Sequence, residues 1–177
     1  MKIISTLKTI RTLLNFVIAI FICNITMGQQ LNLIPYPAQV KRQQGSYTLK
    51  DQLTVSSFFP SSAKGNLVKY LKQELKKLYG INIIEIERSE KASIVLFPAR
   101  MPTGGRPGYK LKVDKEGVRI DANFDESAFH GIQTFLQLLP AEKNVKKEIP
   151  FVSIFDTVRF QYRGMHLDAG RHFFPVS

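Results

Sequence analysis

Two segments with helical spacing stand among short strand-like runs, and this change of period along the chain limits the folds it can adopt. Apolar residues recur every three or four positions over 62–79 and over 126–139, which predicts two amphipathic helices. The remaining runs are short and typical of strands: 40–49, 53–57, 81–86, 93–97 and a hairpin at 109–122. We therefore expect an α+β fold in which two helices pack on an antiparallel sheet.

The first 28 residues have the pattern of a secretory signal peptide. Lys2, Lys8 and Arg11 precede an apolar run that ends at Cys23, and no acidic residue occurs before Asp51. The run is shorter than the roughly 18 apolar residues expected of a membrane-spanning helix. We expect the segment to direct export to the periplasm or the cell exterior and then to be removed.

Cysteine usage excludes several kinds of site. Cys23 is the only cysteine, and it lies within the leader, so the exported chain would contain no thiol. Disulfide frameworks, thiolate zinc sites and cysteine nucleophiles are thereby excluded. We expect neither a metal ion nor another cofactor.

The chain is basic, with a formal net charge of +11, but its cations are spread along the sequence. They fall on one side of the first expected helix and on the outer face of one strand: Lys69, Lys72, Lys76, Lys77, Lys110 and Lys112. No aromatic residues interleave with these cations as a nucleic-acid stacking platform would require. We therefore expect a solvated surface, with neither nucleic acid nor, after export, a membrane as partner. The oligomeric state is left open.

A charged segment between two prolines follows the second expected helix. Residues 141–150 hold lysines and glutamates around Asn144, which is typical of a linker. We place the α+β domain at 29–150 and the start of a second domain at Phe151.

The C-terminal run RFQYRGMHLDAGRHFFPVS carries the most chemistry. It alternates like a strand, which puts Arg163 on the same face as Leu167. An arginine on a buried face needs an anion or a polar ligand. Asp168, Arg171 and His172 follow at the strand's C-terminal end, where parallel α/β barrels carry their active sites. The run therefore indicates part of a sugar or phosphate site.

Three segments, in this order, resemble glycoside hydrolase family 20, the β-N-acetylhexosaminidases. The C-terminal run, with Arg163-Gly164, Leu167-Asp168 and Arg171-His172-Phe173, is similar to the first strand of that family's catalytic barrel. Residues 108–140 resemble the end of its N-terminal accessory domain, and 33–37 (LIPYP) resemble that domain's opening. The resemblance covers nearly all of the chain after the leader.

This resemblance implies an activity. Family members hydrolyse terminal β-linked N-acetylglucosamine or N-acetylgalactosamine with retention, and the partner would be a glycan ending in such a sugar. The 2-acetamido carbonyl attacks the anomeric carbon, an aspartate orients that amide, and the adjacent glutamate protonates the leaving oxygen. A complete (β/α)₈ barrel takes about 250 residues, so 151–177 would be the start of a truncated one.

The resemblance also implies roles for the C-terminal residues. Arg163 would hold O3 and O4 of the non-reducing sugar, because a forked guanidinium suits two neighbouring hydroxyls. A structural pairing of Arg163 with Asp168 is the alternative. Asp168 would orient Arg163 or Arg171 without contacting the sugar, and His172 would pack beneath the site.

The catalytic aspartate–glutamate pair has no counterpart in this sequence. Asp125-Glu126 is the only adjacent pair in that order, and its place at the start of the second expected helix is typical of a favourable interaction with the helix dipole. Two functions follow. The chain is either the N-terminal portion of an exported hexosaminidase, inactive by itself, or an exported non-catalytic carbohydrate-binding or interaction module.

Overall fold

The structure, a computed structural model, describes residues 11, 31–141, 146–160, 162 and 164. Met1–Leu31 and Asn32–Ser177 form separate compact units, and everything below concerns the second. Its elements are β1 (Gln39–Thr48), β2 (Gln52–Ser57), α2 (Ser61–Tyr79), β3 (Asn82–Glu85), β4 (Ile94–Pro98), β5 (Gly108–Asp114), β6 (Gly117–Ala122), α3 (Asp125–Gln137) and β7 (Glu148–Thr157).

The strands form one seven-stranded sheet in the order β1-β7-β5-β6-β4-β2-β3. The pairs β1–β7, β7–β5 and β5–β6 are antiparallel, whereas β6–β4, β4–β2 and β2–β3 are parallel. The expected α+β fold with two helices is confirmed for the described residues, but the expectation of an antiparallel sheet was wrong. The helix between β2 and β3 returns the chain to the same edge, so these two strands run in the same direction.

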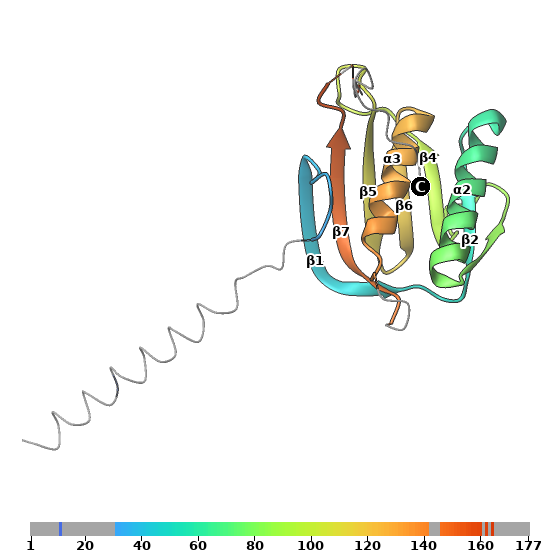
Figure 1. Ribbon diagram of the computed structural model, residues 1–177, viewed down its shortest axis with the longest axis vertical. Helices are drawn as coiled ribbons and strands as arrows, with labels where there is room; N and C mark the ends of the chain where they lie inside the picture. The colour runs from blue at the N-terminus through green and yellow to red at the C-terminus, as the bar shows by residue number, and fades with distance from the viewer. Residues whose placement is uncertain (1–10, 12–30, 142–145, 161, 163, 165–177) are drawn as a thin grey trace, which may run out of the picture. The chain divides into compact units, whose positions relative to one another are not determined.

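The two helices lie side by side on one face of the sheet, as Figure 1 shows. In α2 the predicted apolar positions Leu67, Leu71 and Leu75 are buried, and Gly80 ends the helix in the left-handed conformation at φ 68°. In α3 the side chains of Ile132 and Phe135 are completely buried. The helical periods of the sequence therefore predict both helices and their buried faces.

Phe129 is an exception to the expected apolar face of α3. Its side chain is 37% exposed and lies against Tyr70 of α2, with 4.9 Å between the ring centroids. Tyr70 is also bonded to α3, because the Gln133 amide donates a hydrogen bond of 2.7 Å to its hydroxyl. These contacts join the two helices above the sheet.

The hairpin of β5 and β6 has the expected alternation. Tyr109, Leu111 and Val113 are buried beneath α3, while Lys110 and Lys112 on the other face are exposed. The opposite face of the sheet carries no helix in the described part of the chain.

Strand β7 begins inside the segment expected to be a linker. Residues 148–157 pair with β1 on one side and with β5 on the other, so they lie within the sheet. Ile149, Val152 and Ile154 are among its most buried side chains. The sequence expectation ended this domain at Pro150, whereas the sheet continues to Thr157; where a further domain begins stays a prediction. In the described residues, no helix is long and apolar enough to cross a membrane.

Candidate functional site

The residues predicted to bind or surround the sugar lie outside the described part of the structure. Arg163, Asp168, Arg171 and His172 all fall there, so their roles stay predictions. The helix or strand that most closely precedes them along the chain is β7. A groove lies beside the end of this strand, where the chain leaves the sheet.

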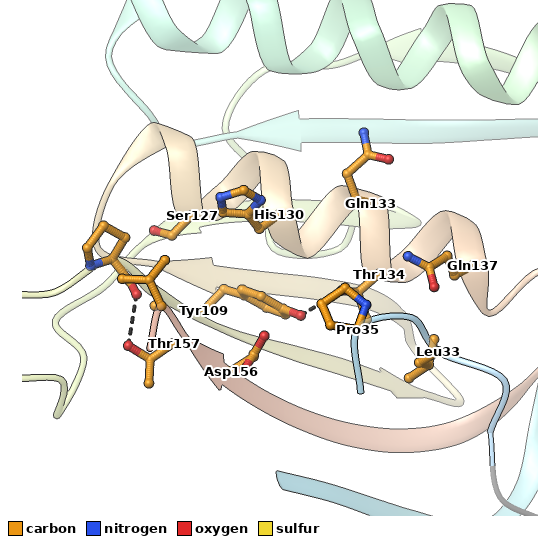
Figure 2. A pocket seen from close by; sticks show the side chains of 13 residues that line it. Leu33, Pro35, Tyr109, Ser127, His130, Gln133, Thr134, Gln137, Asp156 and Thr157 are labelled. Atoms are coloured by element: carbon orange, nitrogen blue, oxygen red, sulfur yellow. Dashed lines mark hydrogen bonds between the residues drawn. The ribbon is translucent and has the colours of Figure 1, made fainter. Parts of the chain in front are cut away.

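This groove lies between α3, the end of β7 and residues 32–38, which precede β1. We call it the β7–α3 groove, and we call residues 32–38 the N-terminal segment. Figure 2 shows side chains from all three elements around it. Its cavity volume is about 130 Å³, which is small for a ligand site. Its lining includes Leu33, Pro35, Tyr109, His130, Gln133, Thr134, Gln137, Asp156 and Val158.

The wall of the groove contains a buried tyrosine. Tyr109 is 3% exposed, and its hydroxyl and that of Thr134 are 2.6 Å apart in a hydrogen bond. The pKa of Tyr109 is raised to about 12: burial is the main cause, the hydrogen bond to Thr134 lowers the pKa, and the charge of Asp156 raises it. Tyr109 is therefore neutral at ordinary pH, which suits packing rather than proton transfer.

Asp156 connects the end of β7 to the N-terminal segment. It pairs with Tyr109 across the sheet, and its Oδ1 accepts a hydrogen bond of 3.1 Å from the backbone amide of Ala38. A carboxylate that accepts a backbone amide so far away in sequence holds two chain segments together.

Gln137, in the last turn of α3, holds the same N-terminal segment. Its side-chain amide donates to the backbone carbonyl of Ile34 at 3.0 Å, and its Oε1 accepts the amide of Ile34 at 2.8 Å. This reciprocal pair satisfies both backbone groups of one residue, as a neighbouring strand would. The N-terminal segment is thereby fixed against α3.

A glycine-rich loop supports the other side of the strand end. Asn123 accepts the amide of Gly108 at 2.9 Å and donates to the carbonyl of Arg106 at 2.8 Å. The hydroxyl of Thr157 and the amide of Val158 both donate to the carbonyl of Pro107, at 2.9 and 3.1 Å. The last residues of β7 are therefore held by the loop as well as by the sheet.

The described residues contain no group of three or more histidine, cysteine or acidic side chains that could hold a metal ion. Asp125 and Glu126 lie in the first turn of α3, as expected, and Oδ1 of Asp125 accepts the amide of Glu126 at 3.0 Å. Both residues are exposed. The hydrogen bond to Asp125 and the negative charge of both residues stabilise the first turn of α3, which is a structural role rather than a catalytic one.

Sequence reasoning did not single out Asp156, Gln137 or Asn123. The partners of Asp156 and Gln137 lie more than 100 positions away in the chain, and no local pattern marks such a pairing. The one available signal was the alternation of β7, which places Asp156 on the same face as Val152 and Ile154.

The comparisons with known proteins agree with this architecture. Residues 30–157 match the family described as glycosyl hydrolase family 20, domain 2. The curated β-hexosaminidase of Porphyromonas gingivalis is 34% identical over 156 residues, which cover 83% of this chain and 20% of that protein. The β-hexosaminidase of Vibrio furnissii is 35% identical over 153 residues, covering 86% and 24%.

Solved structures show the same fold. The Streptomyces plicatus N-acetyl-β-hexosaminidase matches with a TM-score of 0.70 at 28% identity, over 83% of this chain and 30% of that one. The Flavobacterium johnsoniae chitobiase matches with a TM-score of 0.67 at 32% identity, over 82% and 24%. The described residues thus form the accessory domain found in these hydrolases. The chain belongs to glycosyl hydrolase family 20 and spans about a fifth to a quarter of the curated relatives' length.

Proposed function

We propose that this chain is the N-terminal portion of an exported β-N-acetylhexosaminidase that removes terminal β-linked N-acetylglucosamine or N-acetylgalactosamine. The family match over residues 30–157, together with curated β-hexosaminidases at 34% and 35% identity, carries the proposal. The leader over residues 1–28, with its cations ahead of an apolar run, supports export. Because the chain spans 20% to 24% of those relatives, the activity would belong to a longer protein.

The described domain would set the position of the strand that follows it. Thr157 ends β7, and Arg163 follows six positions later. Pro107 accepts hydrogen bonds from both Thr157 and Val158, and Asp156 is tied to the N-terminal segment. A site that binds sugar hydroxyls needs its arginine placed to within a fraction of an ångström, and a braced strand end supplies such placement.

The chemistry would be substrate-assisted. The acetamido oxygen of the sugar would attack the anomeric carbon, an aspartate would orient the amide, and a glutamate would protonate the leaving oxygen. Asp125 and Glu126 lie exposed at a helix start and Tyr109 is neutral, so these three residues are not suited to these roles. The acid pair would come from sequence beyond residue 177.

The test compares the 177-residue chain with the product of its reading frame continued beyond residue 177. Hydrolysis of a chromogenic N-acetylglucosaminide is measured for both. We expect turnover by the longer protein and none by the shorter one, because under this proposal the aspartate–glutamate pair that orients the amide and protonates the leaving group is supplied only by the longer protein. Turnover by the 177-residue chain, or a longer protein that is folded but inactive on N-acetylhexosaminides, would contradict the proposal.

A further inference from the structure

The face of the sheet opposite the helices carries two rows of side chains that run across five strands. Cross-strand neighbours on one face are close enough for their side chains to interact. The registers define the first row as Gln39, Phe155, Lys110, Asp121 and Phe97. The second row is Lys41, Ser153, Lys112, Arg119 and Val95. We call this surface the open face.

Two of its cations are neutralised by neighbouring acids. Lys112 forms an ion pair of 2.6 Å with Asp114. The guanidinium of Arg119 lies 2.8 Å from the carboxylate of Asp121 and 2.9 Å from that of Glu90. The three acids Asp114, Asp121 and Glu90 are thus all paired with Lys112 or Arg119, so this part of the open face carries little net charge.

Three further cations have no such partner. Lys41, Arg100 and Lys110 are exposed, and none of them forms an ion pair within the described part of the chain. All three line one shallow depression of about 510 Å³, together with Phe155. The one acid there, Asp121, is engaged by Arg119. The depression is therefore positively charged.

Aromatic rings lie beside two cations of the open face. Phe155 pairs with Lys110 across β7 and β5 and is half-buried. The ring of Phe97 lies under the guanidinium of Arg119, 4.6 Å from its carbon to the ring centroid. The sequence predicts a solvated surface because no aromatic residues interleave with the lysines as a stacking platform would require. The sheet interleaves them across strands instead.

We propose that the open face binds an anionic polysaccharide, one whose sugars carry carboxylate or sulfate groups. The unpaired cations would contact the anionic groups, and the ring of Phe155 would pack against the apolar C–H face of a sugar. Gln39 and Ser153, beside it in the two rows, offer polar groups to hydroxyls. Lys41 and Lys110 lie two strands apart and two residues apart along the strands, roughly 12 Å between their Cα atoms, so a polymer with one charge every second sugar could contact both.

The shape of the surface favours a polysaccharide over an anionic membrane or a nucleic acid, the other anionic partners that a basic surface could bind. The aromatic rings are half-buried within the sheet, so neither ring projects far enough to enter a bilayer. Nucleic-acid binding uses exposed rings on which whole bases stack. A thin, extended sugar chain can lie in a shallow depression lined with cations. This binding goes beyond the proposed hydrolysis and does not depend on it.

The test measures binding of a fluorescent chondroitin sulfate octasaccharide to the 177-residue chain by anisotropy at low salt. We expect the Lys41→Ala/Lys110→Ala variant to bind on the order of tenfold more weakly, because each lost contact is charge-assisted. The matched control is Lys69→Ala/Lys72→Ala, which removes the same charge from exposed positions on α2. The control should bind like the parent chain, and circular dichroism should show all three folded.

Several results would overturn the proposal. Equal loss of affinity in both double variants would mean that binding follows net charge and not this surface. Absence of binding by the parent chain would contradict it directly. Tighter binding of anionic phospholipid vesicles or of a single-stranded oligonucleotide, lost in the same variant, would assign the surface to a lipid or nucleic-acid partner. A Phe155→Leu variant that keeps full affinity would remove the role given to the ring.

Discussion

Gly131 of α3 lies almost in contact with Ile120 of β6. A Cβ atom added to Gly131 would come within 2.6 Å of Cγ2 of Ile120 and 3.2 Å of the ring of Tyr109. Real Cβ atoms do not approach so closely, so α3 rests on the sheet at this glycine. The close approach also brings Thr134, one turn later, to the hydroxyl of Tyr109.

Replacing Gly131 should therefore destabilise the domain although alanine favours helices. We expect Gly131→Ala to lower the free energy of unfolding by about 1 to 3 kcal/mol, because the helix must move away from Ile120. Urea unfolding monitored by circular dichroism measures this change.

Gly65 of α2 is the matched control, since an added Cβ there meets nothing within 4 Å. Gly65→Ala should raise the stability by about 0.5 to 1 kcal/mol through helix propensity alone. If both substitutions stabilise the protein, α3 does not pack as closely as the structure shows.

The buried hydroxyl of Tyr109 should make stability depend on pH in the alkaline range. Its pKa is raised to about 12 by burial, from a reference value of 10.0. Between these values the unfolded chain releases a proton that the folded chain keeps. The free energy of unfolding should therefore fall as pH rises from 10 to 12, by at most about 1.4 kcal/mol per pH unit. Urea unfolding at a series of pH values measures the slope.

In Tyr109→Phe this alkaline slope should be reduced. The variant should also be less stable at neutral pH by about 1 kcal/mol, because the hydroxyl of Thr134 loses its partner. Tyr36→Phe is the control, since that side chain is 43% exposed, and it should keep the parent slope. An unchanged slope in Tyr109→Phe would show that another group governs the alkaline loss.

Gln137 should determine how firmly the N-terminal segment is held. Gln137→Ala removes both hydrogen bonds to Ile34, and we expect faster amide hydrogen exchange at Ile34, on the order of five- to tenfold for a loss of about 1 kcal/mol. Gln73→Ala, an exposed change on α2, should leave this exchange unchanged. Equal exchange rates in Gln137→Ala and the parent would mean that Leu33 and its neighbours hold the segment by packing.

The helices could be predicted from the sequence, but the directions of the strands could not. Leu67, Leu71 and Leu75 define one buried stripe, and such a stripe fits only the helical period. Strand alternation distinguishes the faces of a sheet and contains no information on which neighbour a strand has. The parallel pairing of Val55 with Ile94 joins segments 39 positions apart, so it depends on the topology of the whole domain.

The sequence did not predict the start of β7, for a related reason. The charged residues around Asn144, between Pro140 and Pro150, have the composition of a linker, yet Pro150 lies within β7, opposite Ser46. The pairing of β1 and β7 shifts register between Arg42 and Ser46, and proline is tolerated where the ladder is irregular. The predicted sugar-site residues fall outside the described residues, so only experiment can test them.

Arg163 gives the sharpest test of the proposed sugar site, and the test uses the longer protein. Arg163→Lys keeps the charge but loses the planar fork that would bond two neighbouring hydroxyls. We expect kcat/KM on an N-acetylglucosaminide to fall on the order of 10- to 1000-fold, which corresponds to about 1.4 kcal/mol per decade. Arg159→Lys, an exposed change four positions earlier in the chain, is the control and should keep full activity with an unchanged melting temperature. An Arg163→Lys enzyme with parental kcat/KM would mean that another residue holds the sugar, even if the hydrolase assignment itself stands.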